Sequence, residues 1–374
     1  MCACFYEVGA NGTALCVNRF VTCSELVACY SSNNLCFKPN HRCLHHPRCN
    51  NHPVCYPVPS FNKQLCPIMT IIPDIPANAS WSQNGFTIAG GNGLGSATNQ
   101  LFWPRGLYLN YDETIVIADS TNHRIIQWTK GDTNGQVVAG GNGRGSQLNQ
   151  LQFPMDVLID KETDSLIICD SENRRVVQWS RHSGTTLGEI LINNTRCYGL
   201  AMDEQRNLYV VDEDEHEVRR YRIGDRFGTD IAGGHGEGDL LYQLNNPYYI
   251  FVDRQQTLYV SDTHNHRVMK WSKGATEGVI AAGGQGSGSA LSQLYLPGGV
   301  FVDTLGTLYV ADSGNHRVVR WPTGAKEGTV IVGGNGEGSA ENQFKSLGGL
   351  SFDRHGDLYM VDMGNFRVQR FTIE

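Results

Sequence analysis

A ten-residue motif that recurs six times constrains this chain more than any other feature. Its clearest copy is Asp-Ser-Gly-Asn-His-Arg-Val-Val-Arg-Trp at residues 312–321. The six copies begin at Asp119, Asp170, Asp212, Asp262, Asp312 and Asp362, at intervals of 51, 42, 50, 50 and 50 residues. A nearly constant period of this length predicts a repeat architecture in which each unit is one supersecondary structure.

Each repeat contains four short runs of β-branched and aromatic residues bounded by turn residues, which predicts four strands. In the fifth repeat these runs are residues 298–303, 308–312, 317–321 and 329–332. Val318 and Trp321 are an odd number of residues apart, so they face opposite sides of their strand. A sheet that is apolar on both sides must lie between two others. Four-stranded antiparallel sheets packed face to face around an axis are the blades of a β-propeller.

The order of the strands predicts how the ring closes. The propeller region starts with a fourth-strand run at residues 86–89 and ends just after a third-strand run at residues 367–371. The opening run is therefore expected to complete the last blade, which removes the free edge of the ring. The predicted fold is an all-β, six-bladed β-propeller over residues 86–374, with four antiparallel strands in each blade.

The motif Asp-x-x-Asn-His-Arg-Val-x-x-Trp, preceded by Leu-Tyr-Val-Ala and followed by Val-Ile-x-Gly-Gly-x-Gly-x-Gly, resembles the NHL repeat. The resemblance covers about residues 86–374 and implies a six-bladed β-propeller. Members of this family are mostly binding platforms: protein-interaction domains, single-stranded RNA binders and extracellular modules. One branch is a zinc-dependent lyase of peptide amidation, which needs histidines near the axis. No histidine stands where the first strands begin, so no lyase site residue is expected here.

Ten of the 12 cysteines lie before residue 67. Residues 1–66 hold too few large apolar side chains for a core, so disulfides are expected to staple this segment, with a connectivity that the sequence leaves open. Four histidines and three cysteines within residues 41–55 also fit a zinc site, although no Cys-x2-Cys pair occurs. The prolines of residues 67–85 predict a linker between this segment and the propeller.

Clustered cysteines and three glycosylation sequons, at Asn11, Asn78 and Asn193, indicate an extracellular location or the secretory pathway. The first residues contain no apolar stretch of signal-peptide length, so we expect a chain without its export signal or a fragment of a longer protein. No run of about 18 apolar residues exists, so no membrane-spanning helix is predicted. Residues 67–374 carry 25 basic and 35 acidic residues, a net charge of −10, which disfavours nucleic acid as a partner.

The repeated Asn-His-Arg has a catalytic and a structural interpretation. His123, His266 and His316 would have to converge to form a metal ring, whereas residues that recur in blade after blade are expected to support the blade. In the structural interpretation the aspartate caps its turn and the asparagine adopts a left-handed backbone conformation. The arginine is then expected to pair with a carboxylate between blades.

Glycine-rich runs begin at Gly90, Gly140, Gly233, Gly283 and Gly333. They contain the spacing of a dinucleotide-binding motif, but that motif requires a helix after the run and none follows. These runs are predicted to be loops that connect one blade to the next.

Departures from the repeat are the places where a specific function is expected. First strands of the ideal repeat begin with glycines, Gly298–Gly299 and Gly348–Gly349, but the earlier repeats carry Arg105, Asp156, Tyr198, Tyr248 and Tyr249. Loops after the motif aspartates add Glu172, Asp214 and His264 on the same face. We expect a lopsided axial mouth, aromatic and acidic on one side and open on the other. Aromatic faces and carboxylates attract positive charge, so the expected ligand is a protein or a small cationic or amphipathic molecule.

These observations predict an extracellular, non-catalytic binding module that uses the loop face of the propeller. The alternative is a lyase or hydrolase that holds a metal at the axis; no other cofactor is expected, and the sequence assigns no catalytic residue. Single-stranded RNA binding is a third, disfavoured interpretation.

Blade three is the weakest copy of the repeat. Its motif reads Glu215-His216-Glu217 in place of Asn-His-Arg, and the loop before its first strand has lost the glycine-rich run and about eight residues. The two propeller cysteines, Cys169 and Cys197, flank this defect at the same end of adjacent blades. They are predicted to form a disulfide between blades two and three; the alternative is two buried thiols.

Overall fold

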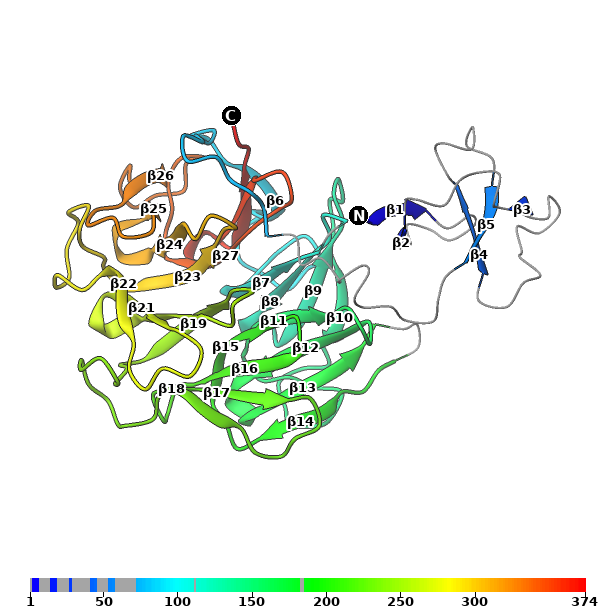
Figure 1. Cartoon of the computed structure of the whole chain (residues 1–374), viewed down its shortest axis with the longest axis horizontal. Coiled ribbons are helices and arrows are strands. Elements are labelled where there is room, and N and C mark those ends of the chain that lie inside the picture. Colours follow the sequence, from blue (N-terminus) through cyan, green and yellow to red (C-terminus); the bar gives the residue numbers. More distant parts are fainter. Residues whose placement is uncertain are drawn as a thin grey trace. The chain divides into compact units, whose positions relative to one another are not determined.

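The computed structural model of the chain (Figure 1) describes residues 72–110, 112–181 and 185–374, together with short strands between residues 2 and 57. The chain forms two compact units, Met1–Thr70 and Ile71–Glu374. Among the described residues, no helix has the length and hydropathy that a membrane span requires.

The described strands of the first unit form two small antiparallel sheets. One pairs β1 (Cys2–Tyr6) with β2 (Ala14–Asn18), and the other has the order β3 (Val27–Ala28), β5 (Pro53–Pro57), β4 (His41–His45). Cys55 of β5 is buried and forms a disulfide. A zinc ion requires a thiolate, so Cys55 does not fit the zinc interpretation of residues 41–55. The histidine side chains of that segment lie outside the described residues.

The second unit contains six four-stranded antiparallel sheets, and each sheet is one blade. Blade one consists of β7 (Pro104–Leu109), β8 (Ile115–Asp119), β9 (Arg124–Trp128) and β10 (Gln136–Gly140). Blade two consists of β11 (Pro154–Asp160), β12 (Ser165–Asp170), β13 (Arg175–Ser180) and β14 (Glu189–Asn193). Blade three consists of β15 (Cys197–Met202), β16 (Asn207–Asp212), β17 (Glu217–Arg222) and β18 (Thr229–Gly233).

The remaining blades follow the same plan. Blade four consists of β19 (Pro247–Val252), β20 (Leu258–Asp262), β21 (Arg267–Trp271) and β22 (Val279–Gly283). Blade five consists of β23 (Pro297–Val302), β24 (Leu308–Asp312), β25 (Arg317–Trp321) and β26 (Thr329–Gly333). Blade six consists of β27 (Leu347–Phe352), β28 (Leu358–Asp362), β29 (Arg367–Phe371) and β6 (Phe86–Gly90). Every blade except blade three has a 3-10 turn between its second and third strands: η3 (Ser120–Asn122), η4 (Ser171–Asn173), η5 (Thr263–Asn265), η6 (Ser313–Asn315) and η7 (Met363–Asn365).

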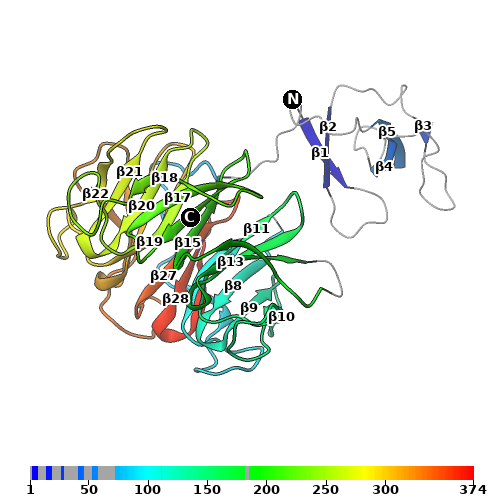
Figure 2. The same cartoon turned by 90° about the horizontal axis from the view of Figure 1, so that it is seen from below.

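The ring closes as the sequence predicted. Strand β6 pairs antiparallel with β29, with Phe86 opposite Arg370 and Ala89 opposite Val368. The six first strands contact one another around the middle of the ring, and the fourth strands lie at its periphery (Figure 1). Figure 2 shows the sheets of blades three and four side by side. The predicted six-bladed propeller is therefore confirmed.

Each blade is apolar on both faces because it packs between two neighbours. In blade five, Val318 belongs to a core cluster with Leu347, the first residue of blade six, and with Phe344, which lies just before that blade. Trp321 belongs to a different cluster with Met269 of blade four. Opposite sides of strand β25 thus contact different blades, as their odd spacing predicts.

The described part of the segment expected to be a linker packs onto the propeller. Ile75 and Trp81 are each 1% exposed and belong to the same core cluster as blades five and six. Trp81 Nε1 donates to the carbonyl oxygen of Gly356 at 2.8 Å. Residues 72–82 therefore form a strap that adds buried apolar surface to the ring.

Three motif side chains tie each regular blade to the loop that enters it. In blade five, Arg317 Nε donates to Asp312 Oδ2 at 2.7 Å, and its other nitrogens donate to three carbonyl oxygens of residues 289–293. Asn315 Nδ2 donates to Asp312 Oδ2, and Asp312 Oδ1 accepts the N–H of Tyr295. The same arrangement recurs around Arg124, Arg175, Arg267 and Arg367.

The motif residues act structurally, but three details differ from the prediction. The arginine pairs with the aspartate of its own blade rather than with a carboxylate between blades. The aspartate makes no side-chain cap to the turn that follows it. The left-handed residue is the histidine, since His316 has a φ of 54°, and Arg174 and Phe366 take this conformation in blades two and six. Left-handed residues other than glycine are uncommon, so the turn geometry fixes this position.

Blade three lacks both the arginine and the loop that the arginine would hold. Glu217 stands at the arginine position, and only residues 194–196 connect β14 to β15. Asp212 instead accepts the hydroxyl of Thr195 at 2.6 Å and the N–H of Asp214 at 3.2 Å. Because the short connection supplies no loop carbonyl oxygens, the missing arginine leaves none of them unsatisfied.

Candidate ligand site at the propeller axis

The starts of the first strands surround the axis, and large side chains come only from blades one to four. The glycines of blades five and six have a packing role that the sequence interpretation missed. A Cβ at Gly298 would lie 3.0 Å from Leu347 O, and one at Gly348 would lie 2.7 Å from Arg105 O. Neighbouring backbones therefore approach too closely there for a larger residue. The missing side chains do not by themselves mean an opening.

Arg105, Tyr198, Tyr248 and His264 form layers across the axis. Arg105 Nη1 donates to Tyr198 Oη at 2.7 Å, and its guanidinium carbon lies 5.9 Å from the centre of the Tyr198 ring. The rings of Tyr198 and Tyr248 stack with centroids 4.1 Å apart and an interplanar angle of 7°. The His264 ring approaches Tyr248 edge-on at 6.2 Å. Four of the eight predicted site residues, from blades one, three and four, are thus brought together.

Tyr249 contacts the same cluster of side chains. Its ring meets Tyr198 edge-on at 5.5 Å, and its side chain belongs to the core cluster of blades three to five. Its hydroxyl is buried and has no partner of hydrogen-bond geometry among the described residues. Burial raises the pKa of Tyr248 to about 12 and that of Tyr249 well above its usual value. All these phenols are therefore neutral near pH 7 and keep their O–H protons.

Asp156 is buried between blades one and three. Its Oδ2 accepts the N–H of Leu200 at 2.9 Å, and its Oδ1 accepts the N–H of Val157 at 2.9 Å. Gly106 leaves room for this carboxyl group, because a Cβ there would lie 2.0 Å from Asp156 Oδ1. Burial raises the pKa of Asp156 to about 7, although both N–H donors oppose this shift. Asp156 therefore joins three first strands at the edge of the site.

The carboxylates predicted to make the mouth acidic are neutralised by two arginines. Arg174 forms an ion pair and hydrogen bond with Asp214, and this bond lowers the pKa of Asp214. Arg196 lies 3.0 Å from Glu172, 3.4 Å from Asp214 and 3.7 Å from Glu213. Arginines from adjacent blades therefore balance most of the charge on the side of the mouth that was expected to be acidic.

The sequence interpretation missed Arg174, Arg196 and Glu213. Arg174 stands at the histidine position of the blade-two motif, and Arg196 directly precedes Cys197 in the shortened connection. Each is therefore a departure from the repeat, which is the same signal that identified the predicted residues. Their pairing was not readable, because Arg174 and Asp214 lie 40 residues apart.

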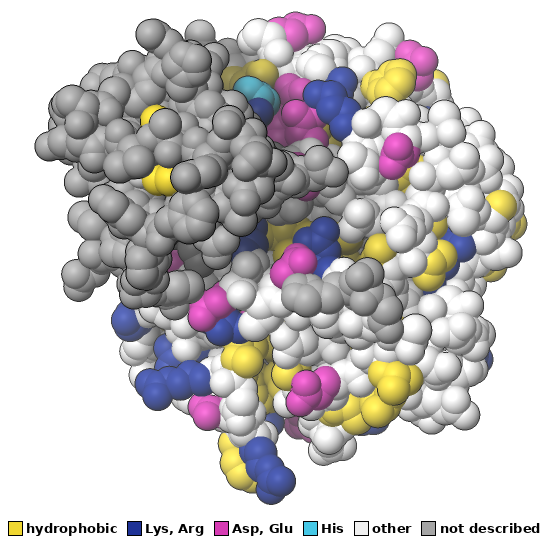
Figure 3. Space-filling view, turned by 90° about the vertical axis from the view of Figure 1, so that its right-hand side faces the viewer, with side chains coloured by type: hydrophobic (Ala, Val, Ile, Leu, Met, Phe, Trp, Pro, Cys, Tyr) yellow, Lys and Arg dark blue, Asp and Glu magenta, His cyan; other side chains and the backbone are white. Residues whose placement is uncertain are grey.

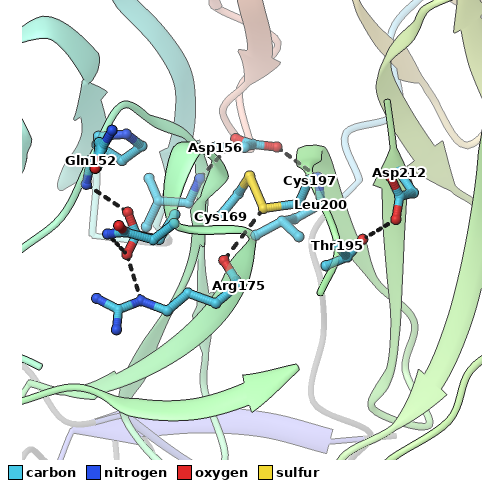
Figure 4. The surroundings of a disulfide bond; sticks show 12 residues. Gln152, Asp156, Cys169, Arg175, Thr195, Cys197, Leu200 and Asp212 are labelled. Carbon is cyan, nitrogen blue, oxygen red and sulfur yellow. Dashed lines mark hydrogen bonds and ion pairs between the residues drawn. A yellow bond between two sulfur atoms is a disulfide. The ribbon is translucent and has the colours of Figure 1, made fainter. Parts of the chain in front are cut away.

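The predicted disulfide is confirmed. Cys169 at the end of β12 and Cys197 at the start of β15 are bonded, with Cα atoms 5.6 Å apart and both side chains fully buried. Figure 4 shows the bond next to Asp156 and Leu200, with the Thr195–Asp212 hydrogen bond nearby. The disulfide therefore joins blades two and three where the connecting loop is shortest.

The sequons and the motif histidines have different surroundings. Asn78 and Asn193 are exposed, and Asn11 lies outside the described residues. His123 Nδ1 accepts the N–H of Phe153 at 3.2 Å, and His266 Nδ1 accepts the N–H of Leu296 at 3.3 Å. The two histidines thus support adjacent loops and do not converge. No group of three His, Cys, Asp or Glu side chains within the described part of the chain is arranged to hold a metal.

Comparisons with known proteins match one repeat of the chain and its fold. Residues 294–321 match the NHL repeat. Searching curated proteins by sequence gave no match. Similar solved structures include an auxiliary nutrient binding protein from Bacteroides thetaiotaomicron, with 16% identity, a TM-score of 0.62 and coverage of 79% of this chain and 77% of that chain.

Two enzymes also share the fold. A gluconolactonase from Xanthomonas campestris has 15% identity and a TM-score of 0.54, over 83% of this chain and 100% of that chain. A catalytically inactive virginiamycin B lyase from Staphylococcus aureus has 11% identity and a TM-score of 0.50, over 78% of this chain and 99% of that chain. At these identities the likeness establishes the fold alone.

The six blades and the recurring Asp-Asn-Arg hydrogen bonds define a six-bladed β-propeller, and tyrosine side chains lie at its axis. Within this propeller, residues 294–321, which end with strand β25 of blade five, match the NHL repeat.

Proposed function

We propose that this chain is an extracellular, non-catalytic binding module whose ligand lies at the axial mouth of the propeller. The observation that carries the proposal is the layered cluster of Arg105, Tyr198 and Tyr248. Blades five and six fold with glycine at the equivalent positions, so a blade does not need these large side chains. Side chains that the scaffold does not require, gathered at one point from three blades, are best explained by a ligand.

An extracellular location is supported by the disulfides. Cys169–Cys197 and the disulfide of Cys55 are bonds that persist in an oxidising compartment. Asn78 and Asn193 are exposed and lie in sequons, so we propose that they carry N-glycans. Protein secreted from eukaryotic cells should lose mass on treatment with peptide N-glycosidase, and unchanged mass would count against this assignment.

A ligand screen tests the binding function. Candidate small molecules and secreted proteins are tested against the full chain, and each hit is measured again with Tyr248→Ala. Loss of this half-buried ring should weaken a ligand of the mouth roughly tenfold. Tyr242→Ala is the matched control, because Tyr242 is a 41% exposed tyrosine in the loop that enters the same blade. Hits that bind both variants equally well would place the binding site elsewhere.

Tyr249 needs a gentler change than alanine. Its side chain is only 6% exposed and lies in a core cluster, so truncation to alanine would cost about 3–5 kcal/mol of stability. Tyr249→Phe removes the hydroxyl alone and preserves the packing.

A metal-dependent lyase or hydrolase remains the second candidate because of Asp156. A carboxyl group with a pKa of about 7 near an axial site has the acidity of a general acid or base. Both Asp156 oxygens already accept backbone N–H bonds, which favours a structural role. Metal analysis of the purified full chain separates the candidates, since a stoichiometric transition metal would favour the enzyme.

RNA binding is the least favoured candidate. Described basic side chains are interspersed with acidic ones on the face that Figure 3 shows, rather than gathered in a patch. Binding of single-stranded RNA would require a concentrated positive field. Salt-sensitive retention of the chain on single-stranded RNA would overturn this ranking.

A further inference from the structure

We infer that the axial mouth takes a small organic carboxylate with a flat, apolar body, rather than a cation. This inference rests on the proposed function and adds the chemical class of the ligand. It is carried by the donors that converge at the mouth and by the charges that are already paired around it.

Arg105 is the arginine of the mouth that has no carboxylate partner. A guanidinium group has five N–H donors, and among the described residues Arg105 donates a side-chain hydrogen bond to one acceptor, Tyr198 Oη. Among the described residues, no carboxylate oxygen lies within the ion-pair distance of 4.0 Å from its nitrogens. Arg174 and Arg196, by contrast, are both paired. The guanidinium of Arg105 is thus left with donors for a ligand.

The tyrosine hydroxyls add further donors. Tyr198 Oη accepts from Arg105 and interacts with the neighbouring Tyr249 hydroxyl, so its own proton can turn toward Tyr249 or toward a ligand. Tyr249 Oη is on a side chain that is only 6% exposed, and it has no partner of hydrogen-bond geometry among the described residues. A buried hydroxyl without a partner costs free energy, and a bound acceptor would recover it. Guanidinium and phenol donors around one point match the oxygens of a carboxylate.

A cationic ligand does not fit the guanidinium and phenol donors of the mouth. A cationic ligand would bring donors to a place that already has donors, and Arg105 would repel it. The carboxylates that would have attracted it, Glu172, Glu213 and Asp214, are engaged by Arg196 and Arg174. The cationic ligand expected from the sequence is therefore replaced by an anion.

The tyrosine rings at the mouth indicate that the ligand has a flat, apolar body. Tyr248 is half-buried, with one face against Tyr198 and part of its ring exposed. Flat aromatic groups pack against such a ring in an offset or edge-to-face arrangement.

Three probes of the same shape and different charge test the inference on the full chain: benzoate, benzamide and benzamidinium. Their dissociation constants are measured by isothermal titration calorimetry or ligand-observed NMR. Benzoate should bind roughly 10–100-fold more tightly than benzamide, because a charge-assisted hydrogen bond adds more than a neutral one. Benzamidinium should bind more weakly than either.

Variants then assign the effect to named groups. Arg105→Gln should abolish the preference for benzoate over benzamide, and Arg105→Lys should restore part of it through charge alone. Tyr249→Phe should weaken benzoate binding roughly two- to tenfold. Arg144→Gln is the matched control, because Arg144 is an exposed arginine that also lies over an aromatic ring, that of Phe153, outside the mouth. Thermal unfolding checks that each variant is folded.

The outcomes separate this inference from the proposed function. Preferential binding of benzamidinium, or equal binding of all three probes that Tyr248→Ala removes, would overturn the carboxylate class and leave the axial binding site standing. No binding of any probe up to about 10 mM would also overturn the carboxylate inference. The proposed function itself fails only if every hit of the ligand screen is indifferent to Tyr248→Ala.

Discussion

Removal of Arg317 should be among the most destabilising changes that leave the propeller core untouched. The Arg317 and Asp312 side chains are 8% and 0% exposed. The guanidinium group makes four hydrogen bonds: one to Asp312 Oδ2 at 2.7 Å and three to carbonyl oxygens of residues 289–293, at 2.8, 3.1 and 3.3 Å. Arg317→Met keeps much of the apolar stem and leaves the buried carboxylate without its cation.

The expected loss is on the order of 3–5 kcal/mol in the free energy of unfolding, which is the usual cost of breaking a buried ion pair from one side. Burial already raises the pKa of Asp312, and Arg317 opposes that shift. Without Arg317 the folded-state pKa of Asp312 rises further, so the folded state binds a proton more readily than the unfolded chain. The loss should therefore be largest above the new pKa and shrink as the pH falls below it.

Blade three supplies the control. Glu217 occupies the same strand position as Arg317, but no long loop with carbonyl oxygens precedes that blade. Glu217 is buried, and its ion pair with Arg219 at 2.6 Å leaves Arg219 a second partner in Asp230. Glu217→Met should therefore cost less than about 1 kcal/mol, since Arg219 is 40% exposed and keeps Asp230 as a partner, so no buried charge is left unpaired.

Denaturant-induced unfolding followed by tryptophan fluorescence gives the two free energies, and hydrogen exchange reports the loop. Arg317→Met should also speed exchange of the amides of residues 284–296, which the guanidinium holds against blade five. The reasoning is refuted if Arg317→Met costs less than about 1 kcal/mol, or if it costs no more than Glu217→Met.

Three further predictions follow from the ring and its cross-links. Deletion of residues 1–90 removes β6 and should give an aggregating protein, whereas deletion of residues 1–70 should leave a soluble monomer by size-exclusion chromatography. Asp156→Asn tests the raised pKa: the free energy of unfolding of the unchanged chain should fall relative to the variant by about 2 kcal/mol between pH 5 and 8, because the folded state holds the proton up to a pKa of about 7. A difference that does not change with pH would mean that Asp156 titrates normally. Changing Cys169 and Cys197 together to serine should lower stability by roughly 3–4 kcal/mol, the chain-entropy value for the 28-residue separation, and alkylation of both cysteines without reductant would disprove the bond.

Much of the fold could be predicted from the sequence because each blade is specified by a short segment of the chain, and that segment is repeated. The period of the motif aspartates gives the number of blades, and the apolar residues on both sides of each strand imply stacked sheets. The position of residues 86–89 before the first complete blade implies the closure with β29, which the structure confirms. The Cys169–Cys197 disulfide followed from antiparallel strand order, which places both residues at the same end of adjacent blades.

The roles of the motif residues were predicted less well. Repetition correctly indicated a structural role, but the partner of each side chain depends on how a turn and a distant loop meet. Arg317 donates hydrogen bonds to carbonyl oxygens 24 to 28 residues earlier in the chain. Every residue has a backbone carbonyl group, so the sequence does not indicate which of them accept these bonds. The left-handed position fell on the histidine because the 3-10 turn ends at Asn315, so His316 is its left-handed C-cap.

The sequence by itself determined the six blades, the closed ring and the positions at which this chain departs from its own repeat. Only the tertiary structure decided the charge of the mouth. Tyr198 is 93 residues from Arg105, and Asp214 is 40 residues from Arg174. Composition identifies these groups, but their ionic partners depend on which side chains the closed ring brings within a few ångströms, since Coulomb interactions and hydrogen bonds act at that range.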